Sequence, residues 1–164
     1  MFNFAGKRLW FALFSIVFLV FLDQFSKAYM IDFLKTQKGY SLYLNPLMNL
    51  VYTWNYGISF GLFSSSPYSN IIFLASNSLI ILYLLASYLF NHQSSDLYLL
   101  VLGGGIGNLI DRFYRGAVFD FIHVHYYDYH FPVFNVADMF ISVGIGLFIL
   151  ETLVRKDDIH RAKR

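Results

Sequence analysis

The chain has 164 residues, of which 57% are hydrophobic, 21% aromatic and only 13% charged. About a quarter of the residues of a soluble domain are charged, so the sequence predicts a membrane protein, and the length predicts a single domain over residues 1–164. The formal net charge of +2, with basic residues gathered at the two ends, argues against nucleic-acid binding. The absence of cysteine excludes disulfides and thiolate metal sites.

Four segments approach the length of about 20 apolar residues that is needed to cross a bilayer. They lie at about 9–30, 69–90, 97–113 and 136–153. The first is too long for the core of a signal peptide, so we expect it to remain as the first helix. The third is interrupted by Asn108 and Asp111, so it is either short or its last turn faces protein and water. The predicted fold class is an all-α membrane protein with four transmembrane helices.

Basic residues flank the first and the last span. Lys7 and Arg8 precede the first span, and five basic residues follow the fourth: Arg155, Lys156, Arg161, Lys163 and Arg164. Because positively charged flanks stay on the cytoplasmic side, we expect both termini to be cytoplasmic. The longer connections, at about 31–68 and 114–135, then face outward.

The two outward connections differ in composition. In the first, residues 40–46 and 47–54 are rich in β-branched and aromatic residues on either side of Pro46, as two strands joined by a turn would be. This connection predicts a small extracytoplasmic β-sheet. The second, from Phe119 to Phe134, is crowded with Tyr, Phe and His, which is typical of an outer loop at the water–lipid boundary.

Two aspartates at the edges of apolar segments, Asp120 and Asp138, are the strongest functional candidates, because a carboxylate beside lipid is costly and usually functional. Two carboxyl groups that approach each other cannot both ionise, so one keeps a proton. Such a pair takes a proton from water and gives one to a carbonyl oxygen. Alternatively, Asn135 caps a helix and Asp138 is its capping-box partner; the two roles are compatible.

Two pairs of residues with four-residue spacing indicate helix contacts. Asp23 and Lys27 are placed for an ion pair on the first helix, with the Lys27 amine extending outward. Gly103 and Gly107 leave a smooth face on the third helix for close packing.

Asn108 and Asp111 fall on one face of the third predicted helix. In one interpretation, Asp111 only pairs with Arg112 or Arg115 at the membrane edge. In the other, Asn108 orients a reacting group and Arg112 supplies a fixed positive charge. The sequence leaves both open.

Histidines in the second connection are the candidates for a metal site. His123, His125, His130 and Asp128 are possible ligands, and His123 and His125 share a face in an extended segment. Nothing else in the sequence completes a convincing site, and aromatic interfacial loops often contain histidine. We therefore expect no metal.

Five short motifs follow one another over about residues 9–153: Asp23-Gln-Phe-Ser-Lys27, Asn55-Tyr-Gly-Ile-Ser-Phe60, Gly103-Gly-Gly-Ile-Gly-Asn108-Leu-Ile-Asp111-Arg112, Val118-Phe-Asp120-Phe-Ile122 and Phe134-Asn135-Val-Ala-Asp138. Together they resemble the lipoprotein signal peptidases, the type II signal peptidases of bacteria. The last three motifs in combination are highly specific, whereas Asp23 and Lys27 alone are not.

The resemblance implies an aspartic endopeptidase of the bacterial inner membrane, with its active site near the outer face. It would remove the signal peptide from prolipoproteins whose cleavage-site cysteine carries a diacylglyceryl group. Asp120 and Asp138 match the catalytic pair, without a metal or cofactor. The expected partners are this substrate and membrane lipids, and the expected state is a monomer. The supporting residues are Asn55, Asn108, Asp111, Arg112, Asn135, Asp23 and Lys27.

Two other classes of function remain possible from the residues alone. A proton-coupled transporter would use the same carboxylates, but a transporter of this size usually contains inverted repeats, and the sequence has no visible repeat. A non-catalytic lipid-binding scaffold would leave the two aspartates without a role.

Overall fold

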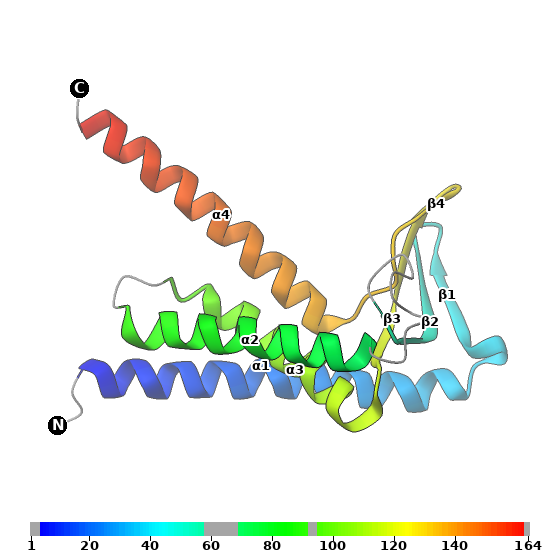
Figure 1. The fold of residues 1–164 in the computed structure, drawn as a ribbon. Coiled ribbons are helices and arrows are strands. Elements are labelled where there is room, and N and C mark those ends of the chain that lie inside the picture. Colours follow the sequence, from blue (N-terminus) through cyan, green and yellow to red (C-terminus); the bar gives the residue numbers. More distant parts are fainter. Residues whose placement is uncertain (1–3, 58–68, 92–94, 163–164) are drawn as a thin grey trace.

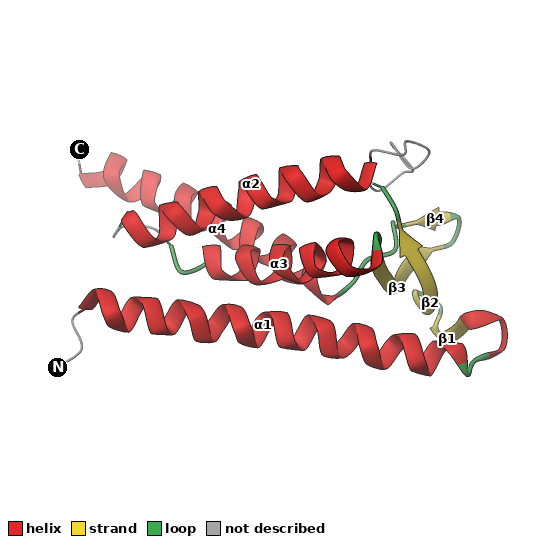
Figure 2. Cartoon of the chain, turned by 60° about the horizontal axis from the view of Figure 1, so that its bottom comes forward, coloured by secondary structure: helices red, strands yellow, loops and turns green. Residues whose placement is uncertain are grey.

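Three helices lie side by side, a fourth leans away from them, and a small sheet covers one end (Figures 1 and 2). The computed structural model describes residues 4–57, 69–91 and 95–162. The start of the first helix and the end of the last helix lie at the end of the molecule opposite the sheet. The helices are α1 (Phe4–Lys35), α2 (Ser69–Phe90), α3 (Tyr98–Arg115) and α4 (Val136–Ala162), and a 3-10 turn, η1 (Lys38–Tyr40), follows α1.

Three helical segments in the described part of the chain are long and apolar enough to cross a membrane: Gly6–Lys35, Asn70–Phe90 and Val136–Arg155. The third predicted span does form a helix, α3, but this helix is not among them. Its glycines and polar residues reduce its hydropathy, and it packs against each of the other three helices. A fourth transmembrane segment therefore stays a prediction.

The sheet is antiparallel, with strands in the order β1-β2-β3-β4. Their bounds are β1 (Ser41–Asn45), β2 (Met48–Asn55), β3 (Val118–Tyr126) and β4 (Tyr129–His130). The first two strands confirm the predicted hairpin around Pro46. The prediction of an outer loop over 119–134 was wrong in part, because β3 pairs with β2 along most of its length.

An aromatic core fixes which face of β3 carries its carboxylate. Phe119 and Phe121 are buried together with Leu34, from the last turn of α1. The ring of Phe119 also lies 5.0 Å from that of Tyr52 and 5.2 Å from that of Trp54. Because side chains alternate along a strand, Asp120 projects from the opposite face. The first helix extends past its predicted end, residue 30, and these added turns support the sheet.

Glycines set the spacing between α3 and its neighbours, as the four-residue spacing predicted. A Cβ atom on Gly103 would lie 2.6 Å from the Leu19 side chain, and one on Gly107 would lie 2.5 Å from Asp23 Oδ2. On another face of α3, a Cβ on Gly104 would come within 2.4 Å of the Ala137 carbonyl oxygen. The absence of side chains here brings α1 and the start of α4 close to α3.

Candidate active site

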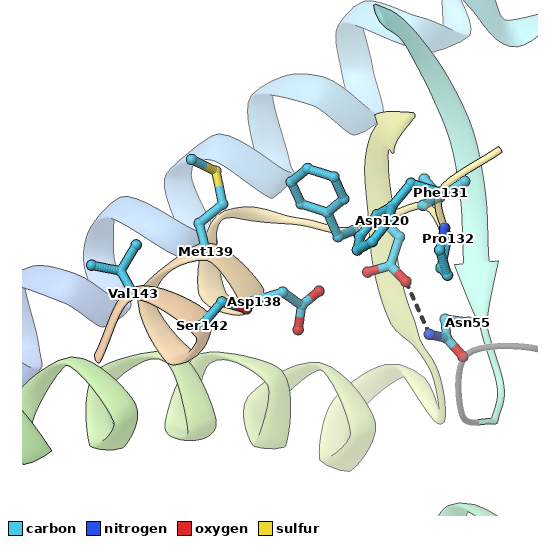
Figure 3. Close-up of a pocket in the computed structure, with 10 residues that line it drawn as sticks. Asn55, Asp120, Phe131, Pro132, Asp138, Met139, Ser142 and Val143 are labelled. Carbon is cyan, nitrogen blue, oxygen red and sulfur yellow. Dashed lines mark hydrogen bonds between the residues drawn. The ribbon is translucent and has the colours of Figure 1, made fainter. Parts of the chain in front are cut away.

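Asp120 and Asp138 come from different elements and line one cavity of about 690 Å³. Asp120 lies on β3 and Asp138 in the first turn of α4. Figure 3 shows the two carboxyl groups pointing toward the same space. Both side chains therefore reach the same cavity. The remaining wall consists of Asn55, Phe131, Pro132, Val133, Phe134, Met139, Ser142 and Val143.

Asn135 connects the two carboxylates. Its side-chain Nδ2 donates to Asp120 Oδ1 at 2.7 Å, and its backbone N–H donates to Asp138 Oδ2 at 3.1 Å. Asn108 Nδ2 donates to the other Asp138 oxygen at 2.8 Å. Asn135 Nδ2 also lies 3.1 Å from Asn108 Oδ1, so the four side chains form one network. The buried amide groups hold both carboxylates in fixed orientations.

The capping interpretation of Asp138 is also confirmed. Asn135 Oδ1 accepts the Asp138 backbone N–H at 3.0 Å, while the Asp138 carboxylate accepts the Asn135 backbone N–H. This reciprocal pair is a capping box. These two bonds fix Asp138 at the start of α4, a position where a helix favours a negatively charged side chain.

Asp120 lies in a drier environment, with only 2% of its surface exposed. Its other donor is Asn55 Nδ2, 3.0 Å from Oδ2 (Figure 3). Burial, and after it the negative charge of Asp138, raises the pKa of the Asp120 carboxyl from 3.8 to about 6. Asp120 therefore retains its proton to a higher pH than an ordinary aspartate does.

The raised pKa of Asp120 predicts a change of stability with pH. A pKa raised from 3.8 to about 6 corresponds to about 3 kcal/mol. This stability is fully present below about pH 4 and is lost as the pH rises through 6. The wild type should therefore lose up to about 3 kcal/mol of unfolding free energy between pH 4 and 7. Asp120→Asn has no carboxyl group to titrate at this position, so its unfolding free energy should rise by that amount relative to the wild type over the same range.

Thermal unfolding in detergent at several pH values measures this difference. Asp32→Asn, at an exposed carboxylate on α1, is the matched control and should follow wild type at every pH. A constant difference between Asp120→Asn and wild type from pH 4 to 7 would contradict the raised pKa.

Lys27 is completely buried between α1 and α3. Its Nζ lies 2.8 Å from Asp23 Oδ2, 2.8 Å from Asp111 Oδ2 and 2.9 Å from Asn108 Oδ1. The predicted ion pair with Asp23 is confirmed, but the prediction of an outward-extending amine was wrong. Carboxylates on both α1 and α3 surround the amine, so it is paired internally. Through Asn108, Lys27 helps to orient Asp138.

The alternatives for Asp111 and Arg112 are also resolved. Asp111 forms an ion pair with Arg115 and with Lys27. Arg112 instead donates to the Gly57 carbonyl oxygen at 3.1 Å and lies over the Phe73 ring. It lines a second cavity, of about 240 Å³, which both aspartates and Asn108 also reach. Arg112 thus places a fixed positive charge beside the carboxylates.

Asp23 and Gln24 connect the first helix to this site. Asp23 Oδ1 accepts the Ala137 backbone N–H at 3.0 Å, at the start of α4. Gln24 was not predicted; its Nε2 lies 3.0 Å from Asp23 Oδ2, 3.1 Å from the Gly107 carbonyl oxygen and 3.3 Å from Asp111 Oδ1. The sequence signal for Gln24 was its position, because it is an amide side chain next to Asp23 within an apolar span.

Of the Asn55 motif, Ile58, Ser59 and Phe60 lie outside the described residues.

The fold and this site define a helical membrane protein with two paired carboxylates at the junction of its helices and its sheet. A family model described as signal peptidase (SPase) II matches residues 15–154. The chain belongs to the signal peptidase II family.

Similar proteins agree with this membership. The lipoprotein signal peptidase of Rickettsia felis is 51% identical over 140 residues, which cover 82% of this chain and 70% of that protein. That of Rickettsia prowazekii is 48% identical over 152 residues, covering 91% and 78%. A solved structure described as a bacterial membrane enzyme, obtained by the in meso method, has a TM-score of 0.75 at 28% identity and covers 90% of each chain.

Proposed function

We propose that this protein is an aspartic endopeptidase that removes the signal peptide from prolipoproteins, cleaving before a cysteine that carries a diacylglyceryl group. The observation that carries the proposal is the placement of Asp120 and Asp138 on one cavity, both held by Asn135. Membership of the signal peptidase II family and relatives named lipoprotein signal peptidase support the substrate class.

In the proposed reaction, a water molecule lies between the two carboxyl groups. Asp138 acts as the base and takes a proton from the water, while the oxygen of that water bonds to the scissile carbonyl carbon. Asp120 gives its proton to the carbonyl oxygen, which forms a gem-diol. When the carbon–nitrogen bond breaks, Asp138 passes its proton to the leaving amine and Asp120 recovers one from a gem-diol hydroxyl. Both carboxyl groups return to their starting states.

Asn108 and Arg112 have supporting roles in this proposal. Asn108 holds one Asp138 oxygen; the other accepts the Asn135 backbone N–H and can accept a second hydrogen bond, from the water. The Arg112 guanidinium, in the adjoining cavity, stabilises the negative charge that develops on the carbonyl oxygen.

The larger cavity suits a lipid-modified substrate. Its wall is mainly apolar, with Phe131, Phe134, Met139 and Val143 close to the two carboxylates. Acyl chains gain about 0.8 kcal/mol per methylene on leaving water, but less on leaving a bilayer. We therefore infer that acylation acts mainly by positioning the cysteine next to the scissile bond.

The proposed setting is a monomer in the bacterial inner membrane, with α3 as the fourth span. The start of α1 and the end of α4 lie at the end of the molecule opposite the sheet (Figure 1). With the basic ends cytoplasmic, the site lies near the outer face of the membrane.

Turnover of a precursor with and without its diacylglyceryl group tests the proposal. The purified protein should cleave the modified precursor before the cysteine, and the unmodified precursor should be a poor substrate even at saturating concentration. EDTA should leave the rate unchanged, because two carboxyl groups carry out the chemistry. Equal turnover of both precursors, or loss of activity with EDTA, would contradict the proposal.

A further inference from the structure

Three histidines gather on one face of the sheet, away from the two aspartates. His123 and His125 lie on β3, and His130, on β4, is the cross-strand partner of His125. The three ring centroids are 5.2, 5.4 and 5.8 Å apart. The sequence showed that His123 and His125 share a face, but only the short strand β4 brings the third ring beside them.

Two nitrogens of this cluster are already at the spacing of metal ligands. His130 Nδ1 and His123 Nε2 lie 3.2 Å apart and form a hydrogen bond, which a bound metal ion would replace. Two nitrogens bound to one tetrahedral zinc, each at 2.0–2.1 Å, are about 3.3 Å apart, and their ring centres roughly 5 Å. A neutral imidazole keeps one proton, so each ring can bind a metal through one nitrogen and carry its proton on the other.

Two buried atoms beside this pair have no hydrogen-bond partner among the described residues. One is His125 Nε2 and the other is Asn49 Oδ1. Asn49 is the cross-strand partner of His123, so it lies on the same face of the sheet. A buried polar atom without a partner is costly and calls for an explanation. A bound cation would satisfy both, because nitrogen lone pairs and amide oxygens are metal ligands.

We propose that His123, His125 and His130, with Asn49 beside them, form a site for a divalent transition-metal ion such as Zn²⁺. Among the described residues, no group of three or more His, Asp or Glu side chains is arranged to hold a metal ion. The proposed site therefore requires the His125 ring to rotate so that one of its nitrogens joins those of His123 and His130. Three histidines are the zinc ligands of carbonic anhydrase, and imidazole also suits Cu²⁺ and Ni²⁺.

The position of the site gives it a structural effect. A metal would tie β4 to β3 one residue before Phe131, where the wall of the larger cavity begins. Metal binding should therefore reduce the mobility of the segment that follows His130. The site does not depend on the proposed peptidase chemistry, because none of its ligands lines the cavity of Asp120 and Asp138.

Calorimetric titration with Zn²⁺ tests this site, using EDTA-treated protein purified in detergent through a tag without histidine. One Zn²⁺ should bind per chain with micromolar affinity, and Mg²⁺ should not bind, because it prefers oxygen ligands. His123→Gln and His130→Gln should each weaken the affinity roughly tenfold or more. Asn49→Asp should strengthen it, because a carboxylate replaces the amide oxygen at the same place.

His160→Gln is the matched control, since His160 belongs to α4 and not to the sheet, and it should bind Zn²⁺ as wild type does. Hydrogen exchange of residues 123–134 should slow when Zn²⁺ is added to wild type and should not change in His130→Gln. Absence of binding to wild type, or equal affinity of the wild type and the His123→Gln/His130→Gln double variant, would overturn the proposal. Asp138→Asn should bind Zn²⁺ normally, so failure of the peptidase proposal would leave this test intact.

Discussion

Asp138→Asn and Asp120→Asn should each reduce cleavage of a diacylglyceryl-modified precursor by about 10²–10⁴-fold, the range that general acid–base groups contribute. Asparagine keeps the shape of aspartate but neither accepts nor donates the proton that the proposed reaction needs. The double variant should lose little more than either single variant, because residues that act as a unit are not additive. Single-turnover cleavage in detergent measures the effect.

Asp32→Asn is the control, because it removes a carboxylate that is exposed on α1. It should cleave at the wild-type rate. Helical circular dichroism should show that all the variants are folded. A wild-type rate in either Asp120→Asn or Asp138→Asn would rule out the catalytic pair.

Lys27→Met should lower the free energy of unfolding by about 3–5 kcal/mol, a loss that is typical when one partner of a buried ion pair is removed. Methionine fills a similar volume but leaves Asp23 and Asp111 without the amine that now contacts both. Cleavage should fall as well, because Asn108 loses the contact that holds its carbonyl oxygen. Thermal unfolding and the cleavage rate are the two measurements.

Asp23→Asn combined with Lys27→Met provides the rescue, because it removes one negative charge together with the positive one. The double variant should recover part of the stability lost in Lys27→Met, as expected for residues that interact directly. Additive losses of stability in the two substitutions would show that the buried charges act independently.

Local sequence predicts the long apolar elements best. The helix over 69–90 was predicted with the bounds that the structure has, because a mainly apolar segment without charged residues specifies its own length. The strand β3 was missed, although Phe119 and Phe121 alternate with Asp120. The same aromatic residues are also typical of a membrane interface, and only the pairing with β2 distinguishes the two.

The candidate site was predictable as a set of residues but not as a network. The cost of a carboxylate near lipid, together with the resemblance, singled out Asp120 and Asp138. The direction of Lys27 was not predictable, since it depends on the rotation of α3, which brings Asp111 opposite it. For the same reason, the sequence left two possible partners for Asp111.

The glycines of α3 limit how this protein can change by mutation. Alanine is a better helix former than glycine by about 1 kcal/mol, yet the Cβ atom of alanine would meet different neighbouring atoms at each glycine of α3. A Cβ on Gly105 would lie 3.3 Å from Cγ1 and 3.5 Å from Cδ1 of the Ile81 side chain, whereas one on Gly104 would lie 2.4 Å from the backbone carbonyl oxygen of Ala137. Gly105→Ala is therefore an accessible change, while Gly104→Ala would push the first turn of α4, which carries Asp138, away from α3. Replacing glycine with alanine therefore cannot stabilise α3 at the positions where close packing holds the two carboxylates together.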